Sequence, residues 1–553
     1  MHWADVIANE LKKKSDEHTI ATGITPSGPI HVGNMREVLT GDAVLRALKD
    51  IDVNAKLIYI GDTFDQLRKV YPFLNKKYEE YVAMPLSEIP CPCSSHKSYA
   101  EHFLLPLLDA LDVLGVEHET LLTHEMYKKG VYSESIKTVL EKKEKIKTIL
   151  ESISKRKLPK DWFPYNPKCS KCKKFKTAST KYEHPYVYYK CACGNEGKAD
   201  IRKDDGKLPW RIDWPARWSF LPITCEPFGK DHAAAGGSYD TGSAIIREVF
   251  GKEPPYPVVY EWVQLKGKGA MHSSTGVAIT ASDMLSMTPP EVLRFMMVRT
   301  NPNKHIDFDP GFGLLNLVDL YDKCERIYFN LEKGGDDQKR VYELAQSKNI
   351  PEKMSTQIPY PHLVTVSQIK DSWDDVLKVL RRCDGKLPCS FPSMLRNLPP
   401  QIPNILGKKP KVFFRKILGK AKGFSVKTQE ISDETKLKQR YECVLFWLKN
   451  FAPESVKFGV QEKLENVIKE RIDGEQKTFL KVMVESINKI KWTPDEIHTK
   501  IYELSRGLNI EPKKSFSAVY LALLGKENGP KLGYFLSSLD KKFVMKRFEE
   551  AAG

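Results

Sequence analysis

The stretch TIATGITPSGPIHVGNMREVLTGDAVLRAL, residues 19–48, decides the fold predicted for this chain. Its β-favouring start, residues 19–22, stops at Gly23, and turn-forming residues follow at 25–29. Apolar residues then recur at helical spacing up to Leu48. A strand, a small-residue loop and a helix in this order direct backbone N–H groups and a positive helix end at an anion. An ordinary βα turn explains the same residues equally well at this point.

A second strand, Ala55–Ile60, completes a β-loop-α-β unit, which is typical of a parallel nucleotide-binding sheet. From about residue 310 onward, helical patterns replace strand signals. Further elements are predicted as helices at 98–115 and 133–155, a strand at 257–263, a helix from Pro290 to Thr300 and a linker at 347–363. The 133–155 pattern is highly charged, and we expect it to be exposed.

The composition indicates a multidomain, non-membrane protein. The chain has 553 residues, 41% hydrophobic and 29% charged, and no apolar run long enough to span a bilayer. A net charge of +16 favours a polyanionic partner, with nucleic acid preferred over a membrane surface. Mildly basic proteins without such a partner are the alternative. Clusters among the eleven cysteines indicate metal sites rather than disulfides in a cytosolic chain.

Two cysteine pairs predict a structural zinc site. Cys169, Cys172, Cys191 and Cys193 have the spacing that wraps a closed tetrahedral thiolate site. A second, weaker cluster consists of Cys91, Cys93, His96 and His102. In the alternative view, His102 simply lies on a helix and the two cysteines are small apolar fillers.

Basic residues dominate residues 408–427, with phenylalanines between them and no acid. This composition suits phosphate contact and base stacking, although a solvated helix face is the alternative. The residues we expect to bind tRNA are Lys408, Lys409, Lys411, Arg415 and Lys416. A separate Gly/Ser loop at 266–280 has the small hydroxyl residues that can close over phosphates, or is merely flexible.

Several segments resemble the class I lysyl-tRNA synthetases, a family of class I aminoacyl-tRNA synthetases typical of archaea. They are GITPSGPIHVGN (23–34), SYAEH (98–102), FGKDHAAAGGSYDTG (228–242), YEW (260–262) and the run at 516–539. The first matches the family's version of the His-Ile-Gly-His signature. The resemblance spans nearly the whole chain. It implies a ligase that activates L-lysine with ATP·Mg²⁺ and transfers it to the terminal adenosine of tRNA(Lys).

The chain departs from the family pattern at two places. The second signature, normally Lys-Met-Ser-Lys-Ser, aligns with Ala270-Met271-His272-Ser273-Ser274, so its leading lysine is absent. Lys266 or Lys268 is the candidate to replace that cation. Ser95 stands where the family tends to have cysteine, so either Cys93 takes its place or the second metal site is lost.

The resemblance also implies roles for individual residues. The catalytic contacts with ATP are assigned to His31, Asn34, Met271, Ser273 and Ser274. ATP binding further involves Pro26, Ser27, Gly28, Gly33, Lys266 and Lys268. The lysine pocket is assigned to Gly23, Thr25, Trp218, Asp231, His232, Tyr260 and Glu261. Trp218 is as well explained as a core tryptophan.

The expected fold is a Rossmann-type parallel-sheet α/β catalytic domain with a zinc-containing insertion, followed by an all-α tRNA-binding region. The expected domains are the catalytic domain (1–90 and 206–300), the insertion (91–205), a stem-contact segment with linker (301–360) and an anticodon-binding domain (361–553). We expect a cytoplasmic monomer that binds ATP, Mg²⁺ and structural Zn²⁺ and no membrane. The alternatives are a class I synthetase for another amino acid, or a non-catalytic tRNA-binding relative, which the weakened second signature favours.

Overall fold

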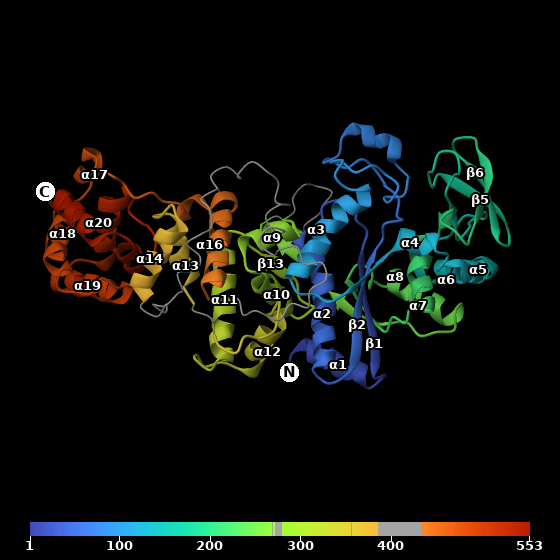
Figure 1. The fold of residues 1–553 in the computed structure, drawn as a ribbon, viewed down its shortest axis with the longest axis horizontal. Coiled ribbons are helices and arrows are strands. Elements are labelled where there is room, and N and C mark those ends of the chain that lie inside the picture. Colours follow the sequence, from blue (N-terminus) through green and yellow to red (C-terminus); the bar gives the residue numbers. More distant parts are fainter. Residues whose placement is uncertain (268, 271–278, 355–356, 385–432) are drawn as a thin grey trace, which may run out of the picture. The chain divides into compact units, whose positions relative to one another are not determined.

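Figure 1 shows the computed structural model of the chain. The structure describes all residues except 268, 271–278, 355–356 and 385–432. The chain divides into two compact units. Unit 1 comprises Met1–Met354 with Lys449–Ala452, and unit 2 comprises Ser355–Leu448 with Pro453–Gly553.

Unit 1 is built on a five-stranded parallel sheet, which confirms the predicted α/β core. Its strand order is β10-β9-β1-β2-β3. The bounds are β1 Glu17–Ile24, β2 Asn54–Gly61, β3 Glu119–Leu122, β9 Cys225–Gly229 and β10 Tyr256–Tyr260. The strand order reverses between β1 and β9. In such sheets ligands bind beyond the carboxyl ends of the strands at the reversal.

The strand expected at 257–263 is divided between two sheets. It ends as β10 at Tyr260, and β11 (Val263–Leu265) joins β12 (Gly269–Ala270) and β13 (Ile306–Phe308) in a separate sheet. The N–H of Glu261 donates to Pro302 O at 2.8 Å, which turns the chain out of the main sheet. Sequence alternation gives no sign of this turn, because Glu261 is the one charged residue in an otherwise largely apolar run.

Both faces of the main sheet are covered, as its apolar strands predict. Helix α2 (Met35–Lys49) packs on β1 and β2. The approach is close at Gly41, where a Cβ would lie 3.0 Å from Thr22 Cγ2 and 3.2 Å from Leu57 Cδ1. On the other face, β1, β2 and β9 share a buried cluster with Trp214 and Trp218 of helix α7 (Trp210–Phe220).

Helix α3 (Tyr99–Val113) connects β2 to β3. Strand β3 is therefore part of the main sheet, and α3 is part of its β2–β3 connection, although both fall within residues 91–205. A module of small sheets and helices follows (Figure 1). Its elements are α4 Thr123–Lys128, α5 Ser133–Glu141, α6 Lys143–Ser154, β4 Asn166–Pro167, β5 Thr177–Glu183, β6 Tyr186–Cys191, β7 Glu196–Asp200 and β8 Gly206–Lys207. The charged pattern at 133–155 therefore forms two helices. It is not simply exposed, because Ile136, Val139, Ile146 and Ile149 are buried.

The remaining elements of unit 1 are helical. They are α1 Trp3–Lys12, η1 Val32–Asn34, η2 Lys76–Tyr81, α8 Ser238–Glu248, α9 Ala281–Met287, α10 Pro290–Val298, α11 Phe312–Tyr328 and α12 Asp336–Ala345. Helix α10 confirms the apolar helix predicted from Pro290.

In the described part of unit 2 every regular element is a helix, as predicted for this region. The C-terminal elements are α13 Tyr360–Ser367, α14 Trp373–Asp384, α16 Asp433–Asn450, η6 Glu454–Val456, α17 Asn466–Glu470, α18 Gly474–Ile487, α19 Pro494–Gly507, α20 Pro512–Leu524, α21 Leu532–Ser538 and α22 Lys541–Ala552. The basic run with Lys408, Lys409, Lys411, Arg415 and Lys416 lies outside the described residues. Within the described chain, no helix combines the length and apolarity needed to cross a bilayer.

Candidate active site and metal centres

The predicted lysine-pocket residues follow the carboxyl ends of the central strands. Gly23 and Thr25 stand at the end of β1, Asp231 and His232 follow β9, and Tyr260 ends β10. The N–H of Lys230 donates to Tyr260 O at 3.0 Å, so the segments after β9 and β10 run together. This is the edge where the strand order reverses, and the fold therefore gathers these residues where a ligand is expected.

Glu37, which the sequence reasoning missed, is the acid that these strands enclose. Its Oε1 accepts the N–H of Gly23 at 2.7 Å, and its Oε2 accepts the hydroxyl of Tyr260 at 2.9 Å. Burial raises the pKa of Glu37 to about 8, although both donors favour the carboxylate. One signal was available in the sequence. Glu37 follows Asn34 by three residues, which places it on the same face of the signature helix.

Glu261 and Asp231 lie at the outer side of this site. Glu261 pairs with Lys230, with 2.7 Å between Oε2 and Nζ, and Asp231 is exposed. His232 lies 3.6 Å from Asp231 and beside the stacked rings of Trp210 and Trp214, at centroid distances of 6.0 and 5.7 Å. A wall of aromatic rings therefore flanks the segment after β9.

Trp218 is a core residue rather than an open pocket wall. It is 4% exposed, and its indole N–H donates to Glu226 Oε2 at 2.7 Å. Trp214 donates to the other oxygen of Glu226 at 2.9 Å. Burial raises the pKa of Glu226 to about 7.

A buried ionic network links Thr25 to the insertion module. The Thr25 hydroxyl donates to Asp65 Oδ2 at 2.8 Å, and Asp65 pairs with Lys207 of β8. Burial alone would raise the pKa of Asp65, but the Lys207 ammonium and the Thr25 hydroxyl hold it below its ordinary value. Beside them, Arg217 pairs with Asp62 and, at 2.6 Å, with Asp213.

The first signature is joined through the backbone to the residues that follow the Gly/Ser loop, Ile279 and Thr280. The N–H of Val32 donates to Ile279 O at 2.8 Å, and His31 forms a β-bridge with Thr280. Asn34 Oδ1 accepts the His31 N–H at 3.2 Å, which fixes the loop that precedes α2. Arg36 is 1% exposed and donates to Trp262 O, Asn301 O, Pro302 O and Lys304 O at 2.6 to 3.4 Å.

The rest of the predicted ATP site is partly described. Ser27 O accepts the Tyr99 hydroxyl at 2.6 Å, and a Cβ at Gly28 would lie 2.8 Å from Phe73 Cζ. Pro26 and Gly33 belong to the same loop and to η1, respectively. Lys266 is exposed, with its Nζ 3.5 Å from Asp309 Oδ2. Lys268, Met271, Ser273 and Ser274 lie outside the described residues.

The first cysteine cluster has the geometry of a zinc site. The ligand atoms of Cys169, Cys172, Cys191 and Cys193 all lie within 4.8 Å of one another. The Sγ atoms are 3.8 Å apart for Cys169–Cys193 and 3.6 Å apart for Cys172–Cys191. Zinc–sulfur bonds of about 2.3 Å give a tetrahedron with edges of about 3.8 Å, so the thiols fit this ion.

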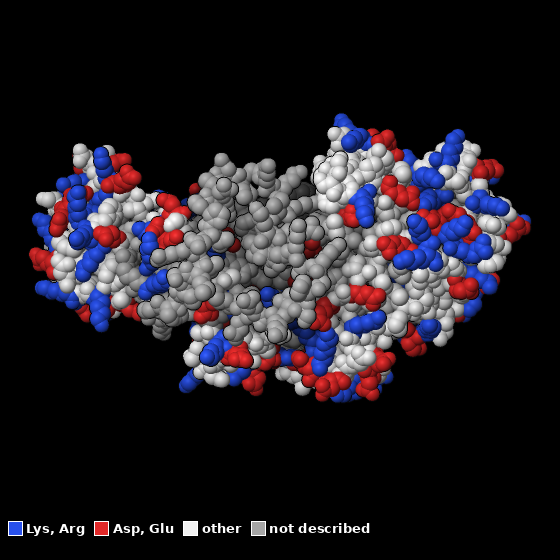
Figure 2. Space-filling model, in the orientation of Figure 1, with Lys and Arg blue, Asp and Glu red and all other residues white. Residues whose placement is uncertain are grey.

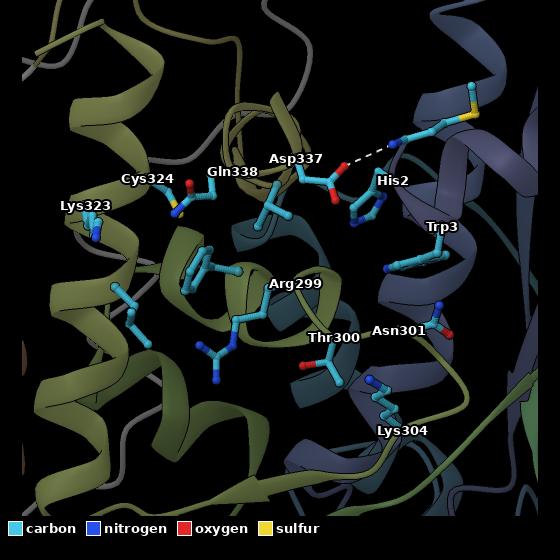
Figure 3. A pocket seen from close by; sticks show the side chains of 14 residues that line it. His2, Trp3, Arg299, Thr300, Asn301, Lys304, Lys323, Cys324, Asp337 and Gln338 are labelled. Carbon is cyan, nitrogen blue, oxygen red and sulfur yellow. Dashed lines mark ion pairs between the residues drawn. The ribbon is translucent and has the colours of Figure 1, made fainter. Parts of the chain in front are cut away.

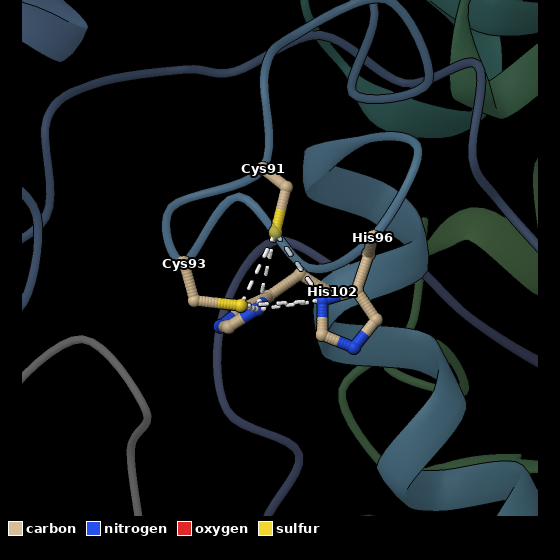
Figure 4. A group of neighbouring side chains, drawn as sticks. All are labelled: Cys91, Cys93, His96 and His102. Carbon is tan, nitrogen blue, oxygen red and sulfur yellow. Dashed lines mark hydrogen bonds between the residues drawn. The ribbon is translucent and has the colours of Figure 1, made fainter.

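The second cluster is equally compact (Figure 4). The Sγ atoms of Cys91 and Cys93 are 3.4 Å apart, and the Nδ1 atoms of His96 and His102 are also 3.4 Å apart. The four sulfur–nitrogen distances run from 3.2 to 3.6 Å. All six pairs thus match the edges of a small tetrahedron, which apolar filler cysteines would have no reason to form.

The structure also has a cavity of about 570 Å³ (Figure 3). It is lined by residues of α1, α10, α11 and α12, among them Trp3, Phe295 and Cys324, and by Arg299, which follows α10. None of the predicted site residues lines it.

Comparison with known proteins identifies the family. Residues 1–348 match the model of "tRNA synthetases class I (K)", and residues 448–552 match that of an anticodon binding domain. The chain is 43% identical to lysine–tRNA ligase 1 of Methanosarcina acetivorans, over 100% of this chain and 98% of the relative. It is 42% identical to the lysine–tRNA ligase of Picrophilus torridus, over 99% and 98%. A glutamate tRNA ligase structure from Elizabethkingia meningosepticum aligns over 97% of this chain and 99% of its own, with 11% identity and a TM-score of 0.44.

The family model and the lysine–tRNA ligase relatives confirm the resemblance first seen at residues 23–34 and 228–242, and they support neither alternative. The chain therefore belongs to the class I lysyl-tRNA synthetase family.

Proposed function

We propose that this chain joins L-lysine to tRNA(Lys) at the carboxyl edge of its parallel sheet. The lysine carboxylate attacks the α-phosphate of ATP, and pyrophosphate leaves to give lysyl-adenylate. The 2′-hydroxyl of the terminal adenosine of tRNA then attacks the acyl carbon and releases AMP. No protein nucleophile is required, since catalysis depends on positioning and on stabilisation of charge at phosphorus.

One observation carries the choice of lysine. Glu37 is an enclosed carboxylate held by two neutral donors, Gly23 N–H and Tyr260 hydroxyl. Among the described residues no ion pair to Glu37 is formed. A ligand with a positively charged end can supply the cation that pairs with Glu37. An ammonium group that leaves water needs a hydrogen-bonded carboxylate as its partner. We assign Glu37 and Tyr260 to the ε-ammonium group of lysine.

The opposite end of lysine lies toward the segment after β9. Asp231 and His232 are our candidates for holding the α-amino group, with Thr25 on the β1 side. Glu261 acts through its ion pair with Lys230, which holds the segment after β10 against the segment after β9 at the outer side of the site. Trp218 shapes this region from the core, through Glu226.

ATP binds along the first signature. His31, Gly33 and Asn34 face the nucleotide, and Pro26, Ser27 and Gly28 form the loop beneath it. The start of η1 and α2 adds the partial positive charge that favours phosphate. Met271, Ser273 and Ser274 close over the triphosphate, Lys266 or Lys268 supplies the cation that Ala270 does not, and Mg²⁺ accompanies ATP.

We assign structural Zn²⁺ to both clusters. Cys169, Cys172, Cys191 and Cys193 hold one ion, and Cys91, Cys93, His96 and His102 hold the other. Four protein ligands leave no open position, so zinc here stabilises the local fold and takes no part in the reaction.

The rest of the chain is assigned to tRNA. Residues 361–553 bind the anticodon side, helped by Lys408, Lys409, Lys411, Arg415 and Lys416. Residues 301–360 contact the stem. The match of residues 448–552 to an anticodon binding domain supports this division. We infer that the protein works as a monomer in the cytoplasm.

The deciding experiment is aminoacylation of purified tRNA by the full chain with each amino acid in turn. We expect charging with lysine alone. Charging with a different amino acid would overturn the assignment of Glu37 to the ε-ammonium group of lysine. A chain that binds tRNA but shows no lysine-dependent exchange between ATP and pyrophosphate would be the non-catalytic relative instead.

A further inference from the structure

The cavity shown in Figure 3 has the size of a small-molecule site and an excess of positive charge. Its volume of about 570 Å³ falls within the range of about 300 to 1,000 Å³ that ligand pockets occupy. The cations that line it are Arg299, Lys304 and Lys323. Among its lining residues in the described chain, the one acid is Asp337, whose Oδ1 lies 3.3 Å from the Met1 amino nitrogen. This balance of charge favours an anionic ligand.

The three cations remain available to such a ligand. Among the described residues, no carboxylate pairs with Arg299 or Lys304. The Arg299 guanidinium lies 5.6 Å from the centroid of the Phe295 ring, which orients the cation without neutralising it. Lys323 Nζ lies 3.5 Å from Glu332 Oε1, beyond ordinary hydrogen-bond length, so this pair is loose. The surface over α4 and β5 differs from the cavity, because Lys and Arg mix there with Asp and Glu (Figure 2).

The apolar side of the cavity is formed before any ligand binds. The Trp3 indole and the His2 ring both bond to the Val298 carbonyl, at 2.8 and 2.9 Å, which fixes the start of α1 to the end of α10. Figure 3 shows the Trp3 ring at one side of the cavity and Arg299 nearer its middle. Leu320, which is 43% exposed, adds a second apolar surface. Cations beside an apolar wall suit an organic anion better than a bare inorganic one.

The turn at residues 301–304 connects the cavity to the active site. Three of its carbonyl oxygens accept the buried Arg36 guanidinium at 2.6 to 3.2 Å, and Arg36 directly precedes Glu37. One of these carbonyls also accepts the N–H of Glu261 at 2.8 Å, and Glu261 directly follows Tyr260. The turn therefore holds the neighbours of both residues assigned to the ε-ammonium group of lysine.

We propose that this cavity binds a small organic phosphate with an aromatic or aliphatic body, and that the bound phosphate strengthens lysine binding. A phosphate monoester carries about 1.5 to 2 negative charges at neutral pH, which suits the cluster of Arg299, Lys304 and Lys323. Trp3 and Leu320 contact the apolar body. By holding the Lys304 side chain, the ligand fixes the turn at 301–304, so less order is lost when lysine binds afterwards. The site lies beyond the proposed reaction, and its occupancy is measured without catalysis.

The test uses 1-naphthyl phosphate as the probe, with inorganic phosphate and 1-naphthol as its two halves. Binding to the full chain is measured by isothermal titration calorimetry. Three variants, L320E, L320Q and L320K, differ only in charge at one exposed position of the cavity. A fourth, R299Q/K304Q/K323Q, removes the three cations. Its control, K12Q/K49Q/K56Q, removes as many from the ends of α1 and α2 and from β2.

The probe should bind at one site, at least about tenfold more tightly than either of its halves. Its Kd should increase from L320K to L320Q to L320E, about threefold at each step, as expected for one charge near the surface. Removing the three cations should weaken binding at least about tenfold, and the control should match the unaltered chain. Equal Kd values for the three Leu320 variants, or equal losses in the two triple variants, would overturn the proposal. Competition of the probe with ATP or with tRNA would also overturn it, since the probe would then occupy one of those sites.

The effect on lysine is measured in the same chains. In the unaltered chain, saturating probe should lower KM for lysine in ATP–pyrophosphate exchange at least about twofold, and in R299Q/K304Q/K323Q it should have no effect. In calorimetry, lysine should tighten binding of the probe by the same factor by which the probe tightens binding of lysine, because such coupling is reciprocal. Unchanged or weakened lysine binding would overturn the link through residues 301–304. If the unaltered chain shows no exchange, the proposed function fails instead, and calorimetry still decides whether the cavity binds the probe.

Discussion

The hydroxyl of Tyr260 donates to Oε2 of Glu37 at 2.9 Å, which joins the last residue of β10 to the first turn of α2. The second oxygen of Glu37 is held by the N–H of Gly23, at 2.7 Å, near the end of β1. The end of β1 and the distant end of β10 thus orient one carboxylate of α2. Because both donors are neutral, they supply no positive charge to the carboxylate when it ionises, as a site for an ammonium group requires.

Glu37→Gln should raise KM for lysine by about ten- to a hundredfold. The amide keeps the shape of the side chain but removes a charge-assisted hydrogen bond worth about 1.5–3 kcal/mol. Lysine-dependent ATP–pyrophosphate exchange measures this without tRNA. Asp231→Asn is the comparison variant. If it raises KM for lysine more than Glu37→Gln does, the ε-ammonium group is assigned to Asp231 instead.

Tyr260→Phe should have a smaller effect of the same kind. It removes one neutral hydrogen bond, worth about 1 kcal/mol, so KM for lysine should rise about fivefold. KM for ATP should stay unchanged in the same exchange assay. An effect on ATP of equal size would mean that Tyr260 supports the whole site rather than the lysine end.

The affinity for lysine should depend on pH through Glu37. Burial raises the pKa of this carboxyl to about 8, so the free protein holds it mostly protonated at neutral pH. An ammonium ligand binds the ionised form, and each pH unit below that pKa weakens binding by up to about tenfold. KM for lysine should therefore fall from pH 6 to 7 and level off above 8. A flat profile in the unaltered chain would contradict the assignment, whereas Glu37→Gln should make the profile flat.

The sequence predicted the parts of this site that are local in the chain. The β1 turn, the strand ends and both metal clusters each lie within a few dozen residues, where periodicity and spacing carry the information. The role of Glu37 and the ion pair between Lys207 and Asp65 were not predicted, because both depend on how segments distant in sequence come together. Helical spacing places Glu37 on the apolar side of α2 but does not show that Tyr260 lies opposite. The division of 257–263 between two sheets depends on Pro302, more than forty residues beyond its start.

The purified chain should carry two zinc ions. Cys172→Ser with Cys193→Ser should remove one, and Cys93→Ser with His102→Ala should remove the other, because each change takes two of four ligands. Metal content by atomic emission and the midpoint of thermal unfolding provide the measurement, and both should fall. Cys324→Ser is the control, since Cys324 belongs to neither cluster. Full zinc content after either double change would contradict the corresponding site.

Lys207→Met should show that the insertion supports the amino-acid pocket. Lys207 ends β8, is 8% exposed and pairs with Asp65, which accepts the Thr25 hydroxyl at 2.8 Å. Removing the ammonium leaves a buried carboxylate without its cation, which costs about 3–5 kcal/mol of the free energy of unfolding or forces Asp65 to take up a proton. Either outcome changes the partner of Thr25, so KM for lysine should rise severalfold.

Two further variants separate the pocket effect from general destabilisation. Lys168→Met removes a similarly buried cation of the same module, which pairs with Glu88 and Asp204 rather than with Asp65. It should lower the unfolding midpoint and leave KM for lysine unchanged. The double variant K207M/D65N should recover much of the lost stability, because no uncompensated charge remains. If Lys168→Met and Lys207→Met raise KM for lysine equally, the insertion affects the pocket only through overall stability, and the link through Asp65 has no separate role.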